Sequence, residues 1–247
     1  MAPNPNIAPA LFDRALLRAR QSRALRSGPA TFLLDRVAED MAERLHAVVR
    51  EFKNAADVGT PGDQVRNVLH ARVDQFARID LPDLESEPLP LQPQSLDLVV
   101  SALAFQFVND LPGVLAQIRR ALKPDGLLLA AMIGGETLTE LRQCFAAAEA
   151  ELEGGVSPRV APFADLRRMG ATNILRERRR TPTRRATMLR MGQIYAERFA
   201  DPDGRIRATF DVIWLSGWAP HESQQQPLRP GSAKASLAEA VRGKPKL

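Results

Sequence analysis

Two continuous apolar runs constrain the fold of this chain more than any other feature. They are LDLVVSALAF (residues 96–105) and GLLLAAMI (residues 126–133), with the helical stretch LPGVLAQIRRALK between them. An uninterrupted apolar run is typical of a strand that is covered on both faces in a parallel sheet. Weaker strand patterns at residues 54–58 and 73–79 flank the helical stretch QVRNVLHAR. Strands that alternate with helices predict an α/β fold, with a mostly parallel, Rossmann-like sheet and flanking helices.

The sequence predicts four parts along the chain. Residues 1–50 form an N-terminal helical cap of two helices, residues 51–155 form the Rossmann-like core, residues 156–223 complete the sheet and a cleft, and residues 224–247 form a flexible tail. The arginine-rich start of the cap has a transit peptide as its alternative interpretation. A Pro-Asp-Gly sequence at 124–126 predicts a turn before the second apolar run.

The segment DVGTPGD (residues 57–63) follows the first expected strand, at the edge where a doubly wound sheet binds ligands. Asp57, Gly59 and Gly62 form an acid-x-Gly-x-x-Gly pattern, in which glycines permit a tight turn and close approach of the backbone to a nucleotide. Two glycines near a proline also make ordinary loops, so both interpretations stay open. Asp80 follows the next expected strand; a carboxylate there can accept hydrogen bonds from both ribose hydroxyls, or it is simply a turn residue.

Candidates for catalysis are few. His221 and Glu222 can form an acid–base pair, although a neighbouring His and Glu are more often solvated. Trp214 and Trp218 stand four residues apart on an expected strand, so they share one face and either pack in the core or at an edge, or line a substrate cleft. No Cys/His cluster has the spacing of a metal site, so we predict no metal. The single cysteine, Cys144, favours a reducing compartment: the cytoplasm of a bacterium, or the mitochondrial matrix of a eukaryote.

The basic residues of this chain are unusual in kind. Arginine supplies 29 of 34, and the formal net charge is +5. The run RERRRTPTRR (residues 176–185) could hold phosphate or an acidic partner, but no aromatic residues interleave with it and acidic residues accompany most arginines elsewhere. An arginine-biased composition therefore explains the charge better than a nucleic-acid surface does. No apolar stretch approaches the roughly 20 residues of a transmembrane helix.

Four blocks of the sequence together resemble a known family. They are DVGTPGD, DLVVSALAFQFVNDLPGVLAQIRRALKPDGLLLAAMIGGETLTELR, EGGVSPRVAPF and GWAPHESQQQPLRPGSA, and the resemblance runs from about residue 11 to residue 237. They are similar to bacterial relatives of a mitochondrial respiratory complex I assembly factor. That family has the class I S-adenosylmethionine-dependent methyltransferase fold, and its activity is hydroxylation of an arginine on a complex I subunit rather than methylation. The resemblance implies S-adenosylmethionine as cofactor and a respiratory subunit as partner.

The resemblance also implies roles for particular residues. The cofactor loop would comprise Asp57, Gly59, Thr60 and Gly62, with Asp80 as the acid that binds the ribose. Glu85 falls where the family has an acidic residue beside the adenine. Ser101 and Leu103 would line the methionine end of the cofactor pocket, and Gln106 the substrate cleft next to it.

The chain departs from the family at several positions. Pro61 replaces the middle glycine of the loop and removes one N–H donor. Gln106 and Phe107 stand where relatives carry histidine and tryptophan. Glu85 comes only five positions after Asp80, where the family fold has a helix and a strand, and a second shortening falls near residue 165.

Two functions compatible with these observations belong to different classes. The first is a methyltransferase-like enzyme that modifies a protein side chain, an arginine of a complex I subunit, by methyl transfer or hydroxylation. The alternative is a non-catalytic assembly chaperone for complex I that keeps the methyltransferase fold. A nucleic-acid methyltransferase has only the arginines in its favour. The sequence leaves the catalytic residues and the oligomeric state open.

Overall fold

The structure is a computed structural model that describes residues 10–81, 88–156, 174–177 and 181–224. Within these ranges, eleven longer elements and two short 3-10 turns follow one another in the order expected of an α/β fold. In chain order they are α1 (Arg14–Arg26), α2 (Phe32–His46), β1 (Phe52–Val58), α3 (Gln64–Leu69), η1 (His70–Arg72), β2 (Val73–Ile79), β3 (Leu96–Ala102), η2 (Phe105–Phe107), α4 (Leu111–Ala121), β4 (Leu122–Ile133), α5 (Thr139–Glu153), α7 (Arg185–Phe199) and β5 (Val212–Trp218).

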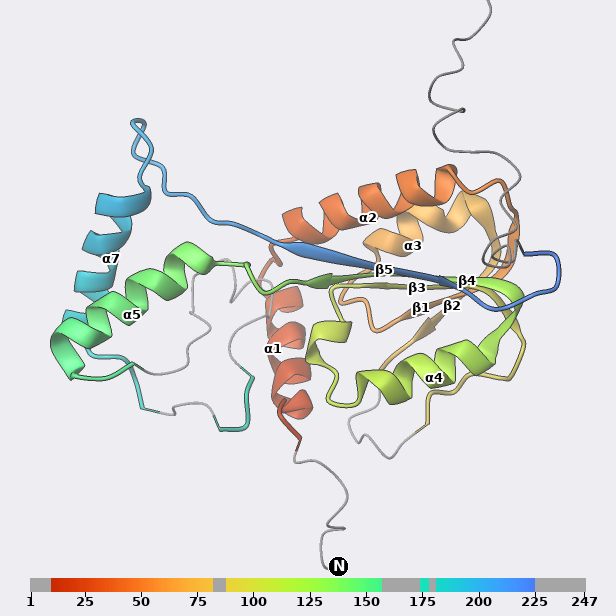
Figure 1. The fold of residues 1–247 in the computed structure, drawn as a ribbon, viewed down its shortest axis with the longest axis horizontal. Helices are drawn as coiled ribbons and strands as arrows, with labels where there is room; N and C mark the ends of the chain where they lie inside the picture. Colours follow the sequence, from red (N-terminus) through yellow and green to blue (C-terminus); the bar gives the residue numbers. More distant parts are fainter. Residues whose placement is uncertain (1–9, 82–87, 157–173, 178–180, 225–247) are drawn as a thin grey trace, which may run out of the picture.

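The strands form one sheet with the order β2-β1-β3-β4-β5 (Figure 1). The first four strands are parallel, and β5 runs antiparallel to β4. The predicted Rossmann-like α/β fold is therefore confirmed. Because the first four strands are parallel, the carboxyl ends of β1, β2, β3 and β4 lie together at one end of the sheet. Strand β5 begins at that end and finishes at the opposite one.

One local prediction is wrong. The Pro-Asp-Gly sequence does not separate a helix from a strand, because β4 already begins at Leu122 and runs through it. The irregularity is absorbed as a register shift between β3 and β4, and Asp125 takes a φ of +62°. Asp125 is held there by tertiary contacts, since its N–H donates to the carbonyl of Ala219 at 3.0 Å and its carboxylate binds Arg50. These contacts come from distant parts of the chain, which a local turn pattern does not contain.

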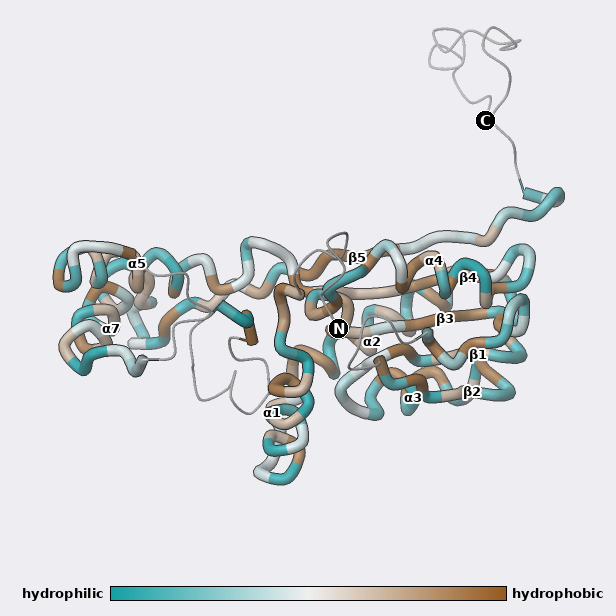
Figure 2. The backbone as a smooth tube through the Cα atoms, turned by 90° about the horizontal axis from the view of Figure 1, so that it is seen from below, coloured by the Kyte–Doolittle hydropathy of each residue, from teal (hydrophilic) through white to brown (hydrophobic). Residues whose placement is uncertain are grey.

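Apolar side chains cover both faces of the sheet. Helices α2 and α3 pack on one face around Met41, Leu69 and Leu98, and α4 packs on the other face around Ile118 and Val99 (Figure 1). Figure 2 shows the apolar stretches concentrated along the central strands. Burial on both faces is what the continuous apolar runs of β3 and β4 predict.

Helices α5 and α7 form a separate packed pair beside the sheet (Figures 1 and 2). Their own apolar cluster includes Leu141, Phe145 and Ile194. Helix α5 ends at Gly154, which adopts the left-handed conformation of a helix terminus, with φ +68°. The pair lies beyond the carboxyl end of β4, so it can form a wall next to the ligand-binding edge.

Candidate functional site

The loop after β1 has a conformation that demands glycine at one position. Gly59 has a φ of +77°, and a Cβ added there would lie 2.6 Å from Cδ1 of Leu81 and 3.1 Å from Cβ of Ala104. Any other residue would be both strained and too close to its neighbours. The loop backbone is thus held tightly against the chain that follows β2 and β3.

A buried carboxylate lies directly before this loop. Asp57 is 1% exposed, and it accepts a hydrogen bond from the hydroxyl of Thr60. The Thr60 hydroxyl in turn accepts one from the N–H of Ala102 at 3.0 Å, which links the loop to the end of β3. The second carboxylate oxygen of Asp57 is buried and has no hydrogen-bond partner among the described residues. Burial raises the pKa of Asp57 to about 6, although the Thr60 hydrogen bond and the charges of Arg78 and Arg66 lower it.

Two cavities adjoin the loop. The smaller, of about 310 Å³, is lined by Gly59, Thr60, Asp80 and Leu81, together with residues of α1. Asp80 is exposed there, with one carboxylate oxygen 3.7 Å from Nε of Arg78. A carboxylate that is free to accept hydrogen bonds in a cavity beside a glycine turn is the arrangement that binds ribose hydroxyls in Rossmann-like folds.

The larger cavity, of about 480 Å³, lies on the other side of the loop. Its walls come from the loop itself, from α1 and α2, from Leu103 and Gln106 after β3, and from the start of α5 together with Phe210. Leu103 has a φ of +53°, and the side-chain amide of Gln106 donates to its carbonyl at 2.8 Å. The lining is mostly apolar, and the side-chain oxygens of Gln64 and Gln106 are buried without a hydrogen-bond partner.

The two cavities share four lining residues: Gln21, Leu25, Pro61 and Phe107. Gln21 and Leu25 belong to α1, so the helical cap covers both cavities. Phe12, just before α1, packs edge-on against Phe107 at 6.3 Å between ring centroids. A ligand with a polar end and an apolar or reactive end could therefore span the loop beneath α1.

The predicted site residues are not all brought together. Asp57, Gly59, Thr60, Gly62, Asp80, Leu103 and Gln106 lie around the loop and the two cavities. Ser101 is fully buried between strands and donates to the carbonyl of Val58 at 2.7 Å, so it braces β1 against β3 and does not line either cavity. Glu85, predicted beside the adenine, lies outside the described residues.

The tryptophans face the cap and not the larger cavity. The guanidinium of Arg44, from α2, lies 4.2 Å from the ring centroid of Trp214, and that of Arg50 lies 5.9 Å from the ring of Trp218. Neither tryptophan is among the residues that line the two cavities. Their placement matches the packing interpretation of the shared face.

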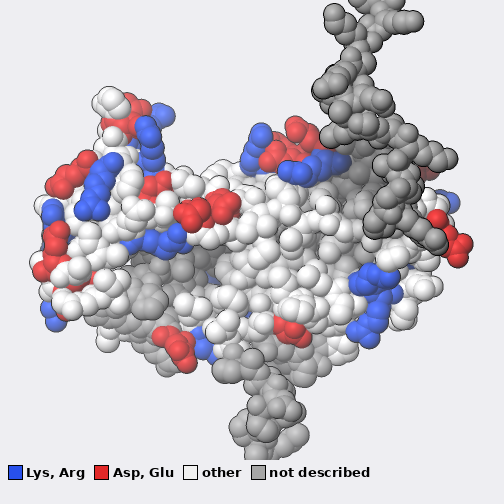
Figure 3. All heavy atoms as spheres, viewed as in Figure 1, with Lys and Arg blue, Asp and Glu red and all other residues white. Residues whose placement is uncertain are grey.

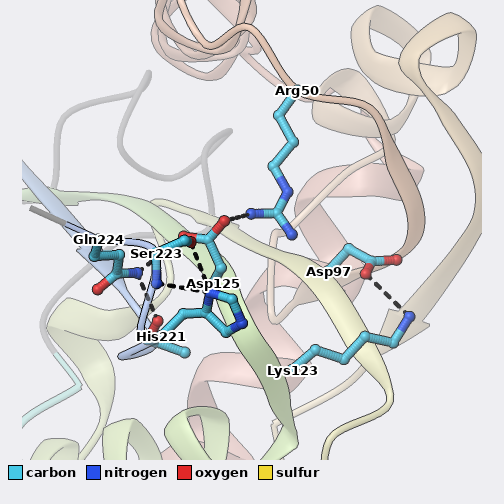
Figure 4. Close-up of polar contacts among 8 residues, drawn as sticks. Arg50, Asp97, Lys123, Asp125, His221, Ser223 and Gln224 are labelled. Carbon is cyan, nitrogen blue, oxygen red and sulfur yellow. Dashed lines mark hydrogen bonds and ion pairs between the residues drawn. The ribbon is translucent and has the colours of Figure 1, made fainter.

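His221 and Glu222 follow the last residue of β5, at the end of the sheet opposite to the glycine loop. Figure 4 shows His221 beside Asp125, Gln224 and Ser223, at the turn where β5 ends and β4 begins. The imidazole Nδ1 lies 2.6 Å from the hydroxyl of Ser223, and the Gln224 side chain donates to Asp125 at 2.9 Å. Because β5 is antiparallel to its neighbour, its last residues are carried away from the chain's own cavities.

Sequence reasoning missed the walls supplied by α1 and α5. Gln21, Leu25, Leu138 and Phe145 reach the site only through packing between distant segments, and no local motif marks them. Gln64 was also not predicted, although it follows Gly62 of the loop by only two residues. In the structure, a Cβ on Gly62 would lie 2.2 Å from its side-chain oxygen.

Comparison with known proteins identifies the class. Residues 40–130 match the model of a methyltransferase domain, and this span includes β1, the glycine loop, β2 and β3. The fold and the match make the chain a protein of the S-adenosylmethionine-dependent methyltransferase type. Among solved structures, it resembles YcgJ of Bacillus subtilis, with a TM-score of 0.45 and 12% identity over 74% of this chain and 98% of that one.

The relatives in sequence are more specific. The mitochondrial arginine-hydroxylase NDUFAF5 of Danio rerio is 32% identical over 93% of this chain and 89% of its own, and the Homo sapiens protein is 31% identical over 93% and 83%. The chain belongs to the NDUFAF5 family. The malonyl-[acyl-carrier protein] O-methyltransferase of Laribacter hongkongensis is 30% identical over 87% of this chain and 82% of its own. The Danio alignment spans 288 positions, more than the 247 residues of this chain, so the relative carries segments that are absent here.

Those absent segments agree with the shortening after Asp80. Among the described residues, no strand pairs with the outer side of β2, and the chain passes from β2 to β3 through residues 80–95 without another strand in its described part. The described part also contains no group of three side chains suited to hold a metal ion and no helix that is long and apolar enough to cross a bilayer.

Proposed function

We propose that this protein binds S-adenosylmethionine across the two cavities and modifies an arginine side chain of a respiratory complex I subunit during assembly of the complex. The observation that carries the proposal is the buried Asp57 carboxylate, whose second oxygen lacks a partner at the base of a glycine turn. A buried acceptor of this kind is costly unless a donor satisfies it. The N–H groups of an amino-acid-like ligand would do so.

Each residue around the loop has a task that its position supports. Asp57 lies beneath the loop, outside the lining of both cavities, and would fix the loop through Thr60 and accept a donor from the ligand. Asp80 lines the smaller cavity and would accept hydrogen bonds from the ribose hydroxyls. Leu103 and Pro61 would enclose the methionine end, beside Gln106. When bound, S-adenosylmethionine supplies an electrophilic methyl group on a sulfonium.

The larger cavity would receive the acceptor side chain. Its apolar walls would exclude water, and the buried oxygens of Gln64 and Gln106 can accept hydrogen bonds from the N–H groups of a guanidinium. The names of the family's relatives include an arginine hydroxylase, which agrees with a guanidinium acceptor. Holding the two reactants in line beneath α1 would raise the rate through proximity.

The proposal is tested by isothermal titration of the full chain with S-adenosylmethionine. We expect binding by the wild type and an affinity about ten- to a hundredfold weaker for Asp57→Asn, because a charged hydrogen bond is lost. Asp74→Asn is the matched control, since Asp74 is an exposed acid on β2. Absence of binding by the wild type at millimolar ligand would overturn the proposal.

A non-catalytic assembly chaperone is the second candidate, and a specific observation favours it. The outer side of β2 has no neighbouring strand in the described structure, so the ribose acid Asp80 lies in an open setting with its side chain 85% exposed. A chaperone would retain a complex I subunit in a pull-down with Asp57→Asn as well as with the wild type. Loss of complex I assembly in that variant, with subunit binding intact, would favour the enzyme.

A further inference from the structure

The two edges of the sheet are built differently. On one edge, β2 reads VDQFARI and exposes the charged residues Asp74 and Arg78. On the other edge, β5 reads VIWLSGW and has no charged residue. Among the described residues, no strand pairs with the outer side of either edge. Charges on an edge strand prevent pairing with other chains, whereas an uncharged apolar edge invites it.

The strand itself contributes no charge to the surface around it, and the nearest cations, Arg44 and Arg50, lie over its two tryptophans. Ile213 and Trp218 are each 43% exposed. Figures 1 and 2 agree that β5 is the outermost strand on the side drawn in Figure 3. That view shows a broad area without Lys, Arg, Asp or Glu across the middle of the molecule, with the charged side chains gathered around its rim. Such a patch with a polar rim is typical of a protein–protein interface.

We propose that β5 pairs with β5 of a second copy of this chain, antiparallel and with the two-fold axis at Leu215. The sequence of the strand is complementary to itself in this register. Trp214 lies opposite the partner's Ser216, Ile213 lies opposite the partner's Gly217, and Val212 lies opposite the partner's Trp218. Trp214 and Ile213 thus meet small residues, Val212 meets the larger Trp218, and no charge faces a like charge. The two sheets become one continuous sheet through an interface that uses the same surface on both copies.

The self-complementarity is what selects a second copy as the occupant. In the antiparallel self-pairing, the bulky first half of β5 faces the Ser-Gly segment in the second half of the other copy. Pairing with a strand of another protein would not require these two halves of β5 to match each other. An acidic or basic partner is not indicated, because the strand offers it no charge.

The pairing has a consequence for the proposed substrate cavity, and this step alone rests on the proposed function. The first residue of β5, Val212, pairs with Ile133, which lines the larger cavity. In an antiparallel pair, the last residue of one β5 lies beside the first residue of the other. The turn that holds His221 and Glu222 points away from its own cavity, but it would lie toward the cavity of the partner.

Sedimentation velocity of the full chain at tens of micromolar tests the pairing. We expect the wild type to be dimeric and Gly217→Lys to be monomeric. A Cβ at Gly217 meets no atom within 4 Å, so the monomer tolerates the lysine, which would face Ile213 of the partner. Gly192→Lys is the matched control, because Gly192 on α7 is equally unobstructed and lies away from β5. A monomeric wild type, or a dimer that persists in Gly217→Lys, would overturn the proposal.

Disulfide formation tests the register. The side chains directly opposite each other in an antiparallel pair are the ones that come within disulfide range. Oxidised Leu215→Cys should form a covalent dimer, whereas Ser216→Cys should not, and the native Cys144 is buried. The reverse pattern would refute the register. Titration of monomeric Gly217→Lys with S-adenosylmethionine keeps the two proposals apart, because retained binding with a lost dimer separates the interface from the cofactor site.

Discussion

The buried carboxylate of Asp57 makes the stability of this protein depend on pH in a defined direction. Burial raises its pKa from 3.8 to about 6 in the folded state. Between these two values the folded protein keeps a proton that the unfolded chain has released. The free energy of unfolding therefore falls as pH rises through this window, and the contribution is lost above the folded pKa. A shift of about two units corresponds to about 3 kcal/mol.

Replacement of Asp57 by asparagine removes the ionisation and keeps the shape. Relative to the wild type, the free energy of unfolding of Asp57→Asn should rise by about 2 kcal/mol between roughly pH 4 and pH 7.5. Comparing the variant with the wild type at each pH cancels the other carboxylates, including Asp97 and Glu140, whose pKa values are lowered in spite of burial because each accepts hydrogen bonds.

Urea denaturation of both proteins at the two pH values measures this difference, with Asp74→Asn as the exposed control. The variant should also lose affinity for S-adenosylmethionine while it gains stability at neutral pH, which excludes unfolding as the cause of weak binding. A difference in unfolding free energy that stays constant with pH, within about 0.5 kcal/mol, would refute the link between burial and the raised pKa.

Three further predictions concern the same region. Gly59→Ala should lower the free energy of unfolding by about 3 kcal/mol, and Gly204→Ala by only about 1 kcal/mol, because both have positive φ but only Gly59 has neighbours in the way; thermal melts compare them. Asp80→Asn should weaken S-adenosylmethionine binding about tenfold in a titration and leave the melting temperature unchanged, since its side chain is 85% exposed. Thr209→Val should lower the free energy of unfolding by about 1–2 kcal/mol near neutral pH and by less below pH 4.5. The reason is that hydrogen bonds from Thr209 to Glu140 keep the pKa of this carboxyl low in spite of its burial. Urea denaturation at neutral pH and below pH 4.5 measures the two losses, and equal losses would contradict the prediction.

The sequence predicted the features that local patterns encode. The apolar runs identified β3 and the core of β4, and the predicted strand at 73–79 has the same bounds as β2. The glycine loop was found because its residues are adjacent in sequence and its backbone requirement is local. Gly59 illustrates this, since its positive φ is a property of one residue.

The direction of a strand within a sheet is set by its pairing with distant strands and not by its own sequence. For this reason the position of His221 relative to the glycine loop could not be predicted. A strand that carries Trp214 and Trp218 was expected, but the direction of this strand decides at which end of the sheet its first and last residues lie. The antiparallel pairing with β4 carries His221 away from the glycine loop. The cavity walls that α1 and α5 supply depend in the same way on how distant helices pack. No sequence motif around Leu25 or Phe145 therefore predicts that these residues line the cavity.

GWAPHES begins one of the four blocks that carry the family resemblance, yet neither its His nor its Glu lines the chain's own cavities. Residues that act in chemistry must reach the reacting atoms, so within one copy this block can only brace the turn around Asp125 or contact another protein. Pairing through β5 offers a third role, because it brings the same turn toward the cavity of the partner. Two variants separate the three roles. His221→Ala should lower the free energy of unfolding if His221 braces the turn. If His221 contributes to the partner's cavity, His221→Ala should lower activity in the dimer and have no effect in a monomer. Monomeric Gly217→Lys is the background that distinguishes the last two roles, since a contact with another protein would survive in it and a contribution to the partner's cavity would not.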